Sequence, residues 1–136
     1  MFEAKLKDVP FFSKLSKREL ATVAQQADEV DVGVGRALAV EGEFGREFFV
    51  ILDGTAEVLR GDTVIAELGP GEFFGEMALL DEDRRTATVK SISPMKVLVM
   101  TRQSFRDIDR AMPEINAAVL EAINQRRAAL QAANAG

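Results

Sequence analysis

The sequence predicts a mainly β protein, an antiparallel β-roll of the jelly-roll type with helices at both ends. Between residues 29 and 100, short apolar runs alternate with glycines, and many short strands joined by glycine turns are typical of an antiparallel sandwich or barrel. Outside that stretch the apolar residues recur at the spacing of amphipathic helices. The 136 residues suit one domain over 1–136, with a helical segment at 1–28, the β-roll at 29–100 and further helices at 101–133.

The first predicted helix lies in the run LSKRELATVAQQA. Ser16 followed by Glu19 has the spacing of a capping box, in which each side chain bonds the other residue's backbone N–H. One face of the helix is apolar and carries Leu20, Val23, Ala24 and Ala27.

The predicted strands lie in VDVG, ALAVEG, EFFVILDG, TAEVLRG, TVIAELG, ATVKSI and KVLVM. The RGD triplet of Arg60, Gly61 and Asp62 falls between two of these runs and is interpreted as a hairpin turn. Phenylalanines of this region are expected in the core rather than as a stacking surface for nucleic acid. They are Phe44, Phe48, Phe49, Phe73 and Phe74.

Two helices are predicted after the strands, in TRQSFRDIDRAM and in PEINAAVLEAINQRRAALQAANA, where Pro113 suits a first helical turn. At 100° per residue Arg126 falls within the apolar stripe of the last helix. A charge there is costly unless it meets a partner or extends to water. A surface arginine and a ligand contact both remain open for Arg126.

Composition excludes several classes of function. The chain has no cysteine and no histidine, which removes thiolate chemistry, imidazole bases and the usual metal sites. We therefore expect no catalytic residue, metal or cofactor, and no enzyme activity. A net charge of −5 argues against binding nucleic acid. No apolar run approaches a membrane span, and no secretion signal precedes the first helix, so a cytoplasmic location without membrane insertion is expected.

The stretch FGEMALLDEDRRTAT points to an anion site. A short helix is expected to begin near Glu76, and a helix N-terminus presents unpaired N–H groups to an anion. Gly75 lets the backbone approach a ligand. Arg85 offers a planar fork of donors that suits phosphate oxygens, while Thr86 adds a hydroxyl and Ala87 an amide.

Taken alone, each charged residue has a simpler role. Glu76 could merely complement the helix dipole, and Arg85 could pair at the surface with Asp81, Glu82 or Asp83. A carboxylate beside an anion site makes sense if the ligand carries a hydroxyl near its phosphate. The pair together indicates a nucleotide with a phosphate and a sugar hydroxyl.

This stretch resembles the phosphate-binding cassette of the cyclic nucleotide-binding domain family. The residues in register are Gly75, Glu76, Ala78, Leu79, Arg85, Thr86, Ala87, Val89 and Ser91. An upstream family signature also fits, and it consists of Gly42, Glu43 and Gly45, the apolar residues 48–51, and Gly54. Ala39 departs from the pattern, where a bulkier aliphatic residue is usual.

The resemblance implies a role for each cassette residue. Glu76 would accept a bond from the ribose 2′-hydroxyl, and Arg85 would pair with the cyclic phosphate. Arg84 has no role in the family and is interpreted as a solvated loop charge near Asp81, Glu82 and Asp83. The last helix resembles that of bacterial cyclic-nucleotide-gated potassium channels, in which an arginine covers the purine, here Arg126. The candidate ligand-binding residues are Phe74, Gly75, Glu76, Met77, Ala78, Arg85, Thr86, Ala87 and Arg126.

The expected function is that of a cytosolic receptor or regulatory module for cAMP, and for cGMP as a second ligand, that changes conformation on binding and acts on an effector protein or an attached domain. Threonine after the cassette arginine is associated in the family with cGMP, although it also occurs in cAMP receptors. The alternative is a degenerate β-roll that binds another protein without nucleotide. A jelly-roll oxygenase would need histidine ligands and is ranked last.

Overall fold

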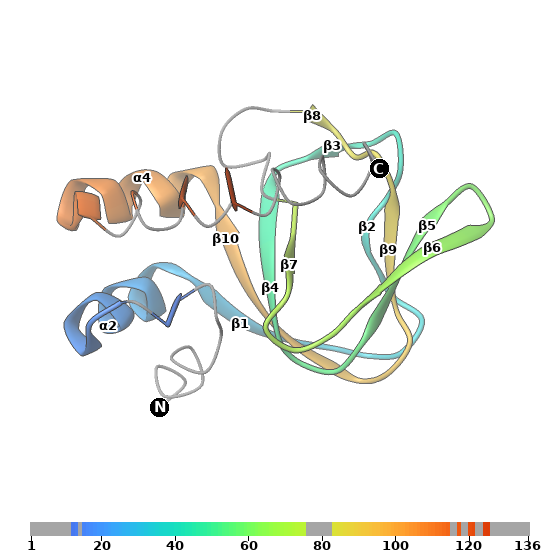
Figure 1. The fold of residues 1–136 in the computed structure, drawn as a ribbon, viewed down its shortest axis with the longest axis horizontal. Coiled ribbons are helices and arrows are strands. Elements are labelled where there is room, and N and C mark those ends of the chain that lie inside the picture. Colours follow the sequence, from blue (N-terminus) through green and yellow to red (C-terminus); the bar gives the residue numbers. More distant parts are fainter. Residues whose placement is uncertain are drawn as a thin grey trace.

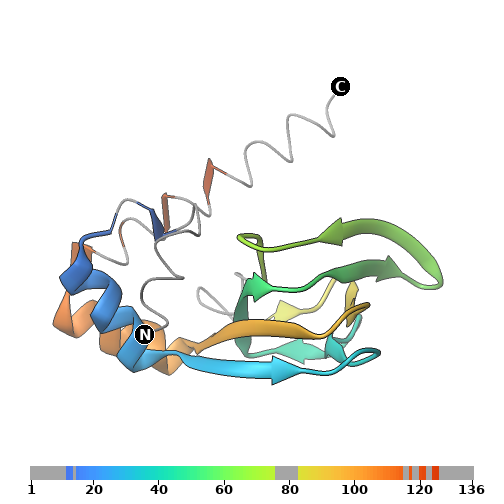
Figure 2. The ribbon, with the colours of Figure 1, turned by 90° about the horizontal axis from the view of Figure 1, so that it is seen from below.

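The computed structural model describes residues 12–13, 15–75, 83–114, 117, 120–121 and 124–125, without the side chains of residues 83 and 109. Two four-stranded antiparallel sheets form two layers, and helices pack at one end (Figures 1 and 2). The first sheet has the order β1-β10-β4-β7, and the second has the order β2-β9-β5-β6. The predicted fold class, mainly antiparallel β with flanking helices, is confirmed.

The elements follow the predicted order along the chain. Their bounds are α2 (Lys17–Gln26), β1 (Asp28–Val32), β2 (Ala37–Ala39), β3 (Phe44–Gly45), β4 (Glu47–Asp53), β5 (Ala56–Arg60), β6 (Thr63–Leu68), β7 (Phe73–Phe74), β8 (Asp83–Arg84), β9 (Thr88–Ser91), β10 (Met95–Thr101) and α4 (Arg102–Ala111). The cassette helix expected near residue 76 lies outside the described residues. Of the last predicted helix, the described positions between 113 and 125 are helical.

The capping box predicted for the first helix is present. The Glu19 N–H donates to Ser16 Oγ at 3.1 Å, and the Ser16 N–H donates to Glu19 Oε1 at 2.8 Å. Helix α4 begins in the same way, with Thr101 as its N-cap and Ser104 as the third residue. Both capping boxes satisfy backbone donors at the helix starts. Helices α2 and α4 pack against each other, and α4 also packs against β10 of the first sheet (Figure 1).

Strand β4 explains why the sequence contains an unbroken apolar run. Successive side chains of a strand point to opposite faces. Phe48 and Val50 therefore lie on the helix side of the first sheet, and Phe49 and Ile51 lie between the two sheets. A strand that is buried on both faces has no polar positions along its centre.

The two faces of this strand belong to two separate cores. The helix-side core consists of Phe12, Leu15, Leu20, Val23, Ala27, Phe48, Val50, Phe73, Leu98, Met100 and Ile108. The inter-sheet core consists of Ala39, Phe49, Ile51, Ala56, Leu68, Phe74, Val89, Met95 and Val97. Each core contains one pair of aromatic rings, an edge-to-face pair with centroids 5.6 Å apart in the first and a stacked pair at 4.8 Å in the second.

The core prediction holds for the other four phenylalanines but is wrong for Phe44, which is 61% exposed. Phe44 lies in β3, a strand of two residues that pairs with β8 alone. Phe44 belongs to neither core cluster of the described residues, and its ring stays at the surface. A single aromatic residue between two turn glycines does not indicate in the sequence whether its ring is buried or exposed.

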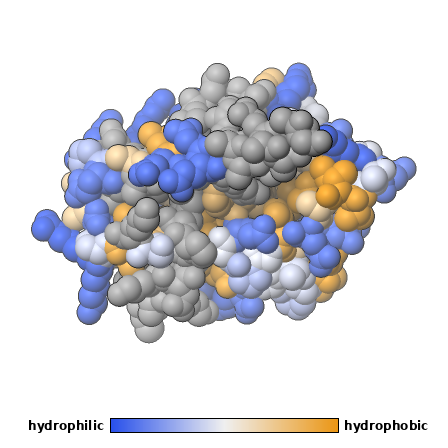
Figure 3. All heavy atoms as spheres, in the orientation of Figure 1, coloured by the Kyte–Doolittle hydropathy of each residue, from blue (hydrophilic) through white to orange (hydrophobic). Residues whose placement is uncertain are grey.

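The RGD triplet forms the predicted turn between β5 and β6, and Gly61 has a φ of 57°. Strand β6 is the outer strand of its sheet, and its Val64 and Ile65 are exposed. Apolar atoms accordingly appear at the right of Figure 3, where Figure 1 draws this hairpin. Among the described residues, no helix is long and apolar enough to cross a membrane.

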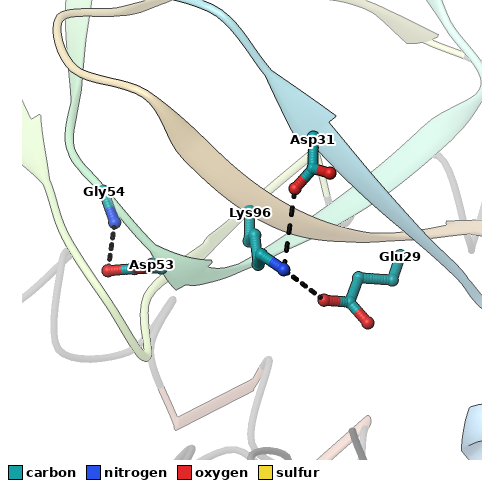
Figure 4. Close-up of polar contacts among 5 residues, drawn as sticks. All are labelled: Glu29, Asp31, Asp53, Gly54 and Lys96. Carbon is teal, nitrogen blue, oxygen red and sulfur yellow. Dashed lines mark hydrogen bonds and ion pairs between the residues drawn. The ribbon is translucent and has the colours of Figure 1, made fainter.

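A small charge cluster lies where β1, the outer strand of the first sheet, pairs with β10 (Figure 4). Lys96 Nζ is 3.5 Å from Glu29 Oε1 and 3.8 Å from Asp31 Oδ1. Beside it Gly54 turns the chain with a φ of 88° and donates its N–H to Asp53 Oδ1 at 3.0 Å. A β-carbon at Gly54 would overlap the backbone of the neighbouring loop, which explains the glycine of the upstream signature.

Candidate phosphate-binding site

The site is built around Arg85, which follows β8 and precedes β9. The Arg85 N–H donates to the Glu43 carbonyl at 2.7 Å, and the Gly42 N–H donates to the Arg85 carbonyl at 2.9 Å. These two bonds continue the pairing of β3 with β8. The turn of the upstream glycine signature is thereby joined to the arginine of the cassette, although about forty residues separate them in the chain.

The guanidinium of Arg85 lies in a cradle made of backbone. Arg85 Nη2 donates to the Glu47 carbonyl at 2.6 Å. A β-carbon at Gly45 would overlap the guanidinium, and one at Gly75 would lie 2.6 Å from Nη1 and 2.7 Å from the Glu47 carbonyl. Gly75 also has a φ of 80°, a backbone conformation that residues with a side chain rarely adopt. We call Gly45, the Glu47 carbonyl and Gly75 the arginine cradle.

The structure brings several predicted site residues together and places one differently. Arg85 and Gly75 are in contact, and Thr86 and Ala87 follow Arg85 directly, with Thr86 exposed and Ala87 half-buried. The Phe74 ring stacks on Phe49 and is 7% exposed, so only the backbone of Phe74 can face a ligand. Glu76, Met77, Ala78 and Arg126 lie outside the described residues.

Gly45 and Glu47 were missed as parts of the site. Gly45 belonged to the upstream signature, and its spacing from Gly42 was the signal that could have drawn attention to it. The contribution of Glu47 comes from its carbonyl, which every residue has, so the side-chain pattern carries no sign of it.

The interpretation of Arg84 as a solvated charge near Asp81, Glu82 and Asp83 needs correction. Arg84 is exposed, but its Cζ lies 4.4 Å from the centroid of the Phe44 ring, and its Nη1 donates to the Gly42 carbonyl at 2.7 Å. Residues 81 and 82 and the side chain of residue 83 lie outside the described part. Arg84 thus contacts the same turn as Arg85 does.

Two hydroxyl groups of β9 fasten the loops around the site. Thr88 Oγ1 accepts the Glu41 N–H at 3.0 Å, immediately before the glycine turn. Ser91 is buried, donates its hydroxyl to the Gly33 carbonyl at 2.6 Å and accepts the Arg36 N–H at 2.9 Å. Both hydroxyl groups form hydrogen bonds with backbone groups of the β-roll. Those of Ser91 explain why the cassette pattern has a serine at position 91.

The arginine cradle holds a cation in a fixed orientation against the main chain. A guanidinium presents five N–H donors in one plane and matches two phosphate oxygens at once. Main-chain contacts with Gly45, Gly75 and Glu47 restrict the orientation of that plane. Among the described residues, no three acidic side chains gather in a way that could hold a metal ion.

Comparison with known proteins decides the family. Residues 29–111, which include both the cradle and the glycine turn, match the model of the family described as "Cyclic nucleotide-binding domain". The chain belongs to the cyclic nucleotide-binding domain family. The resemblance inferred from the cassette and the upstream signature is thereby confirmed, and with it the assignment to a regulatory, cyclic-nucleotide-binding type of domain.

A curated relative and two solved structures illustrate this family likeness. The cAMP-dependent protein kinase regulatory subunit of Mycosarcoma maydis is 35% identical over 77% of this chain, and the match spans 22% of that protein's length. The crystal structure of the N-terminal domain of a transcriptional regulator from Streptomyces coelicolor A3(2) is 27% identical, with a TM-score of 0.81 over 95% of this chain and 94% of that one. The structure of cAMP-bound PfPKA-R is 28% identical, with a TM-score of 0.73 over 90% of this chain and 46% of that one.

Proposed function

We propose that this cyclic nucleotide-binding domain is a cAMP receptor module, with cGMP as a second ligand, and that Arg85 holds the cyclic phosphate. The observation that carries the proposal is the arginine cradle. A guanidinium packed against two glycines and bonded to a carbonyl is already oriented, so little side-chain entropy is lost when an anion binds.

The other ligand contacts follow from the family pattern. Backbone groups of residues 74, 75, 77, 78 and 87 would surround the phosphate together with the Thr86 hydroxyl. Glu76 would accept a hydrogen bond from the ribose 2′-hydroxyl, and Arg126 would cover the purine by cation–π stacking or a hydrogen bond. The name of the Mycosarcoma maydis relative and the bound ligand of PfPKA-R support cAMP as the first ligand.

The proposed output is a conformational change rather than a reaction. Binding would draw the cassette and the last helix together over the ligand, and a ligand that binds one conformation better shifts the population toward it. An effector protein or an attached domain would sense that shift. The domain would then regulate without catalysing anything itself.

Isothermal titration with cAMP and cGMP tests the proposal, with Arg85→Ala as the site variant. A hydrogen bond to a charged group contributes about 1.5–3 kcal/mol, so the variant is expected to bind at least about ten-fold more weakly. Arg110→Ala is the matched control, because Arg110 is an exposed arginine near the end of α4, outside the candidate site. It is expected to bind like the unmodified protein.

Two results would count against the proposal. If the unmodified protein gives no heat with either nucleotide at high micromolar concentration, the receptor function is wrong. If Arg85→Ala binds as tightly as Arg110→Ala does, the phosphate contact is assigned to the wrong residue. The alternative of a nucleotide-independent interaction module predicts the first result.

A further inference from the structure

Beside the arginine cradle, Phe44 and Arg84 form a pair that the proposed ligand contacts do not use. The Arg84 guanidinium lies over the Phe44 ring, with its Cζ 4.4 Å from the centroid, and also donates to the Gly42 carbonyl. The ring is 61% exposed and belongs to neither core. The Phe44–Arg84 contact therefore buries little apolar surface, and its role must lie elsewhere.

The pair joins two very short strands. Strands β3 and β8 have two residues each, with Phe44 opposite Arg84 and Gly45 opposite Asp83. A two-stranded ribbon is marginally stable by itself, even when it is longer than this one. Contacts between opposite side chains are what stabilise such pairing beyond its few backbone bonds, so the Phe44–Arg84 contact bears directly on whether the ribbon stays closed.

Both sides of the cradle are attached to this ribbon. Gly45, which packs against the guanidinium, follows Phe44 directly, and Arg85 follows Arg84 directly. The bond from the Arg85 N–H to the Glu43 carbonyl crosses between the same two segments. If the ribbon opened, Gly45 would move away from the Arg85 guanidinium, and the cradle would lose one side.

We propose that the Phe44–Arg84 pair is a brace that keeps the turn of residues 42–45 closed on Arg85 and so fixes where the guanidinium meets the phosphate. Phe44 and Arg84 are then positioning residues, which act through Arg85 and touch no ligand atom. This inference rests on the proposed function, since its consequence is measured as nucleotide affinity.

Affinity for a fluorescent cAMP analogue, measured by polarisation and checked by competition with unlabelled cAMP, tests the brace. A cation–π contact at an exposed site corresponds to an affinity change of about two- to five-fold. We expect Phe44→Ala and Arg84→Ala each to weaken binding by about that factor, while urea unfolding stays a single transition with a midpoint close to that of the unmodified protein. Val34→Ala is the matched control, because Val34 is also 61% exposed and lies in a different turn.

Two further comparisons distinguish a brace from a simple loss of apolar surface and from two independent contacts. Phe44→Trp keeps an aromatic face under the guanidinium and should retain the unmodified affinity, whereas Phe44→Leu keeps an apolar side chain without that face and should not. The double variant Phe44→Ala/Arg84→Ala should bind as the weaker single variant does, because either change already opens the brace. Additive losses would mean that the two residues act independently, and the brace would be wrong.

A readout that needs no ligand completes the test. In the unmodified protein the ¹⁵N relaxation of Arg85 Nε should report a rigid side chain, and in Phe44→Ala it should report a mobile one. If the unmodified protein binds cAMP but Phe44→Ala has the same affinity and the same relaxation, the brace alone is refuted. If the unmodified protein binds no nucleotide, the proposed function is refuted, and the relaxation experiment decides the brace by itself.

Discussion

Gly45 and Gly75 contribute to the site through the space they leave rather than through a side chain. The guanidinium of Arg85 occupies the volume that a β-carbon on Gly45 would need. At Gly45 the φ is not positive, so an alanine there is not strained by its own backbone. The main effect of an alanine at Gly45 is therefore that its β-carbon displaces the Arg85 guanidinium.

Gly45→Ala is expected to weaken cAMP binding about ten-fold or more, because it pushes the guanidinium out of the cradle that orients it for phosphate. Isothermal titration measures the loss. The matched control is Gly33→Ala, where a β-carbon meets nothing within 4 Å and φ is not positive. Equal affinities of the two variants would show that the cradle does not set the position of Arg85.

Thr86 is exposed and follows Arg85, the proposed phosphate contact, so its hydroxyl is placed to bond a guanine base in the proposed complex. Removing it with Thr86→Ala is expected to weaken cGMP binding more than cAMP binding. Competition titration with both nucleotides measures the two changes side by side. The same change for both ligands would mean that this hydroxyl does not discriminate between them.

At the scale of elements, helices α2 and α4 are both started by local sequence. Ser16 and Glu19 close one capping box, and Thr101 and Ser104 close the other. The first box was predictable because its residues are three positions apart and precede an apolar stripe. By contrast the ribbon of β3 and β8 had no local signal, since each strand has only two residues and its partner lies far away in the chain.

Ser16→Ala is expected to lower the free energy of unfolding by about 1 kcal/mol, because the N–H of Glu19 loses its acceptor at the start of α2. Urea unfolding followed by circular dichroism measures the change. Lys17→Ala, at the next position in the helix, serves as control and should stay within about 0.5 kcal/mol of the unmodified protein. A similar loss in both variants would show that the missing cap is not what lowers the stability.

At the scale of the whole molecule, the first sheet is shared by the two cores. Its central strand β4 sends Phe48 and Val50 to the helix side and Phe49 and Ile51 to the second sheet. A disturbance on either face of β4 therefore reaches both layers. We expect residues 1–136 to unfold as one cooperative unit for this reason, which agrees with the single domain predicted from the length.

Phe48→Ala is expected to cost about 3–5 kcal/mol of stability, since the ring is fully buried against Phe73 and leaves a cavity. Urea unfolding followed by both near- and far-ultraviolet circular dichroism should show one shifted transition. Phe44→Ala is the matched aromatic control and should change stability by no more than about 0.5 kcal/mol. Two separate transitions would contradict the prediction of a single unit.

The sequence by itself determined the features that depend on neighbours along the chain. The cap at Ser16 and the β5–β6 turn follow from local spacing, because helix and strand periodicities are properties of consecutive residues. The pairing of Gly-Glu with a later arginine likewise indicated a nucleotide site. The family pattern of that site could be identified from the residue types and their spacing alone.

Only the tertiary structure decided which distant residues meet at that site. Gly45 and Gly75 lie on different strands and loops, and their contact with one guanidinium depends on how the sheets are packed. The exposure of Phe44 and its stacking on Arg84 have the same origin. Contacts of this kind arise when the whole core closes, because cooperative packing sets the chain path that brings separated segments to within bonding distance.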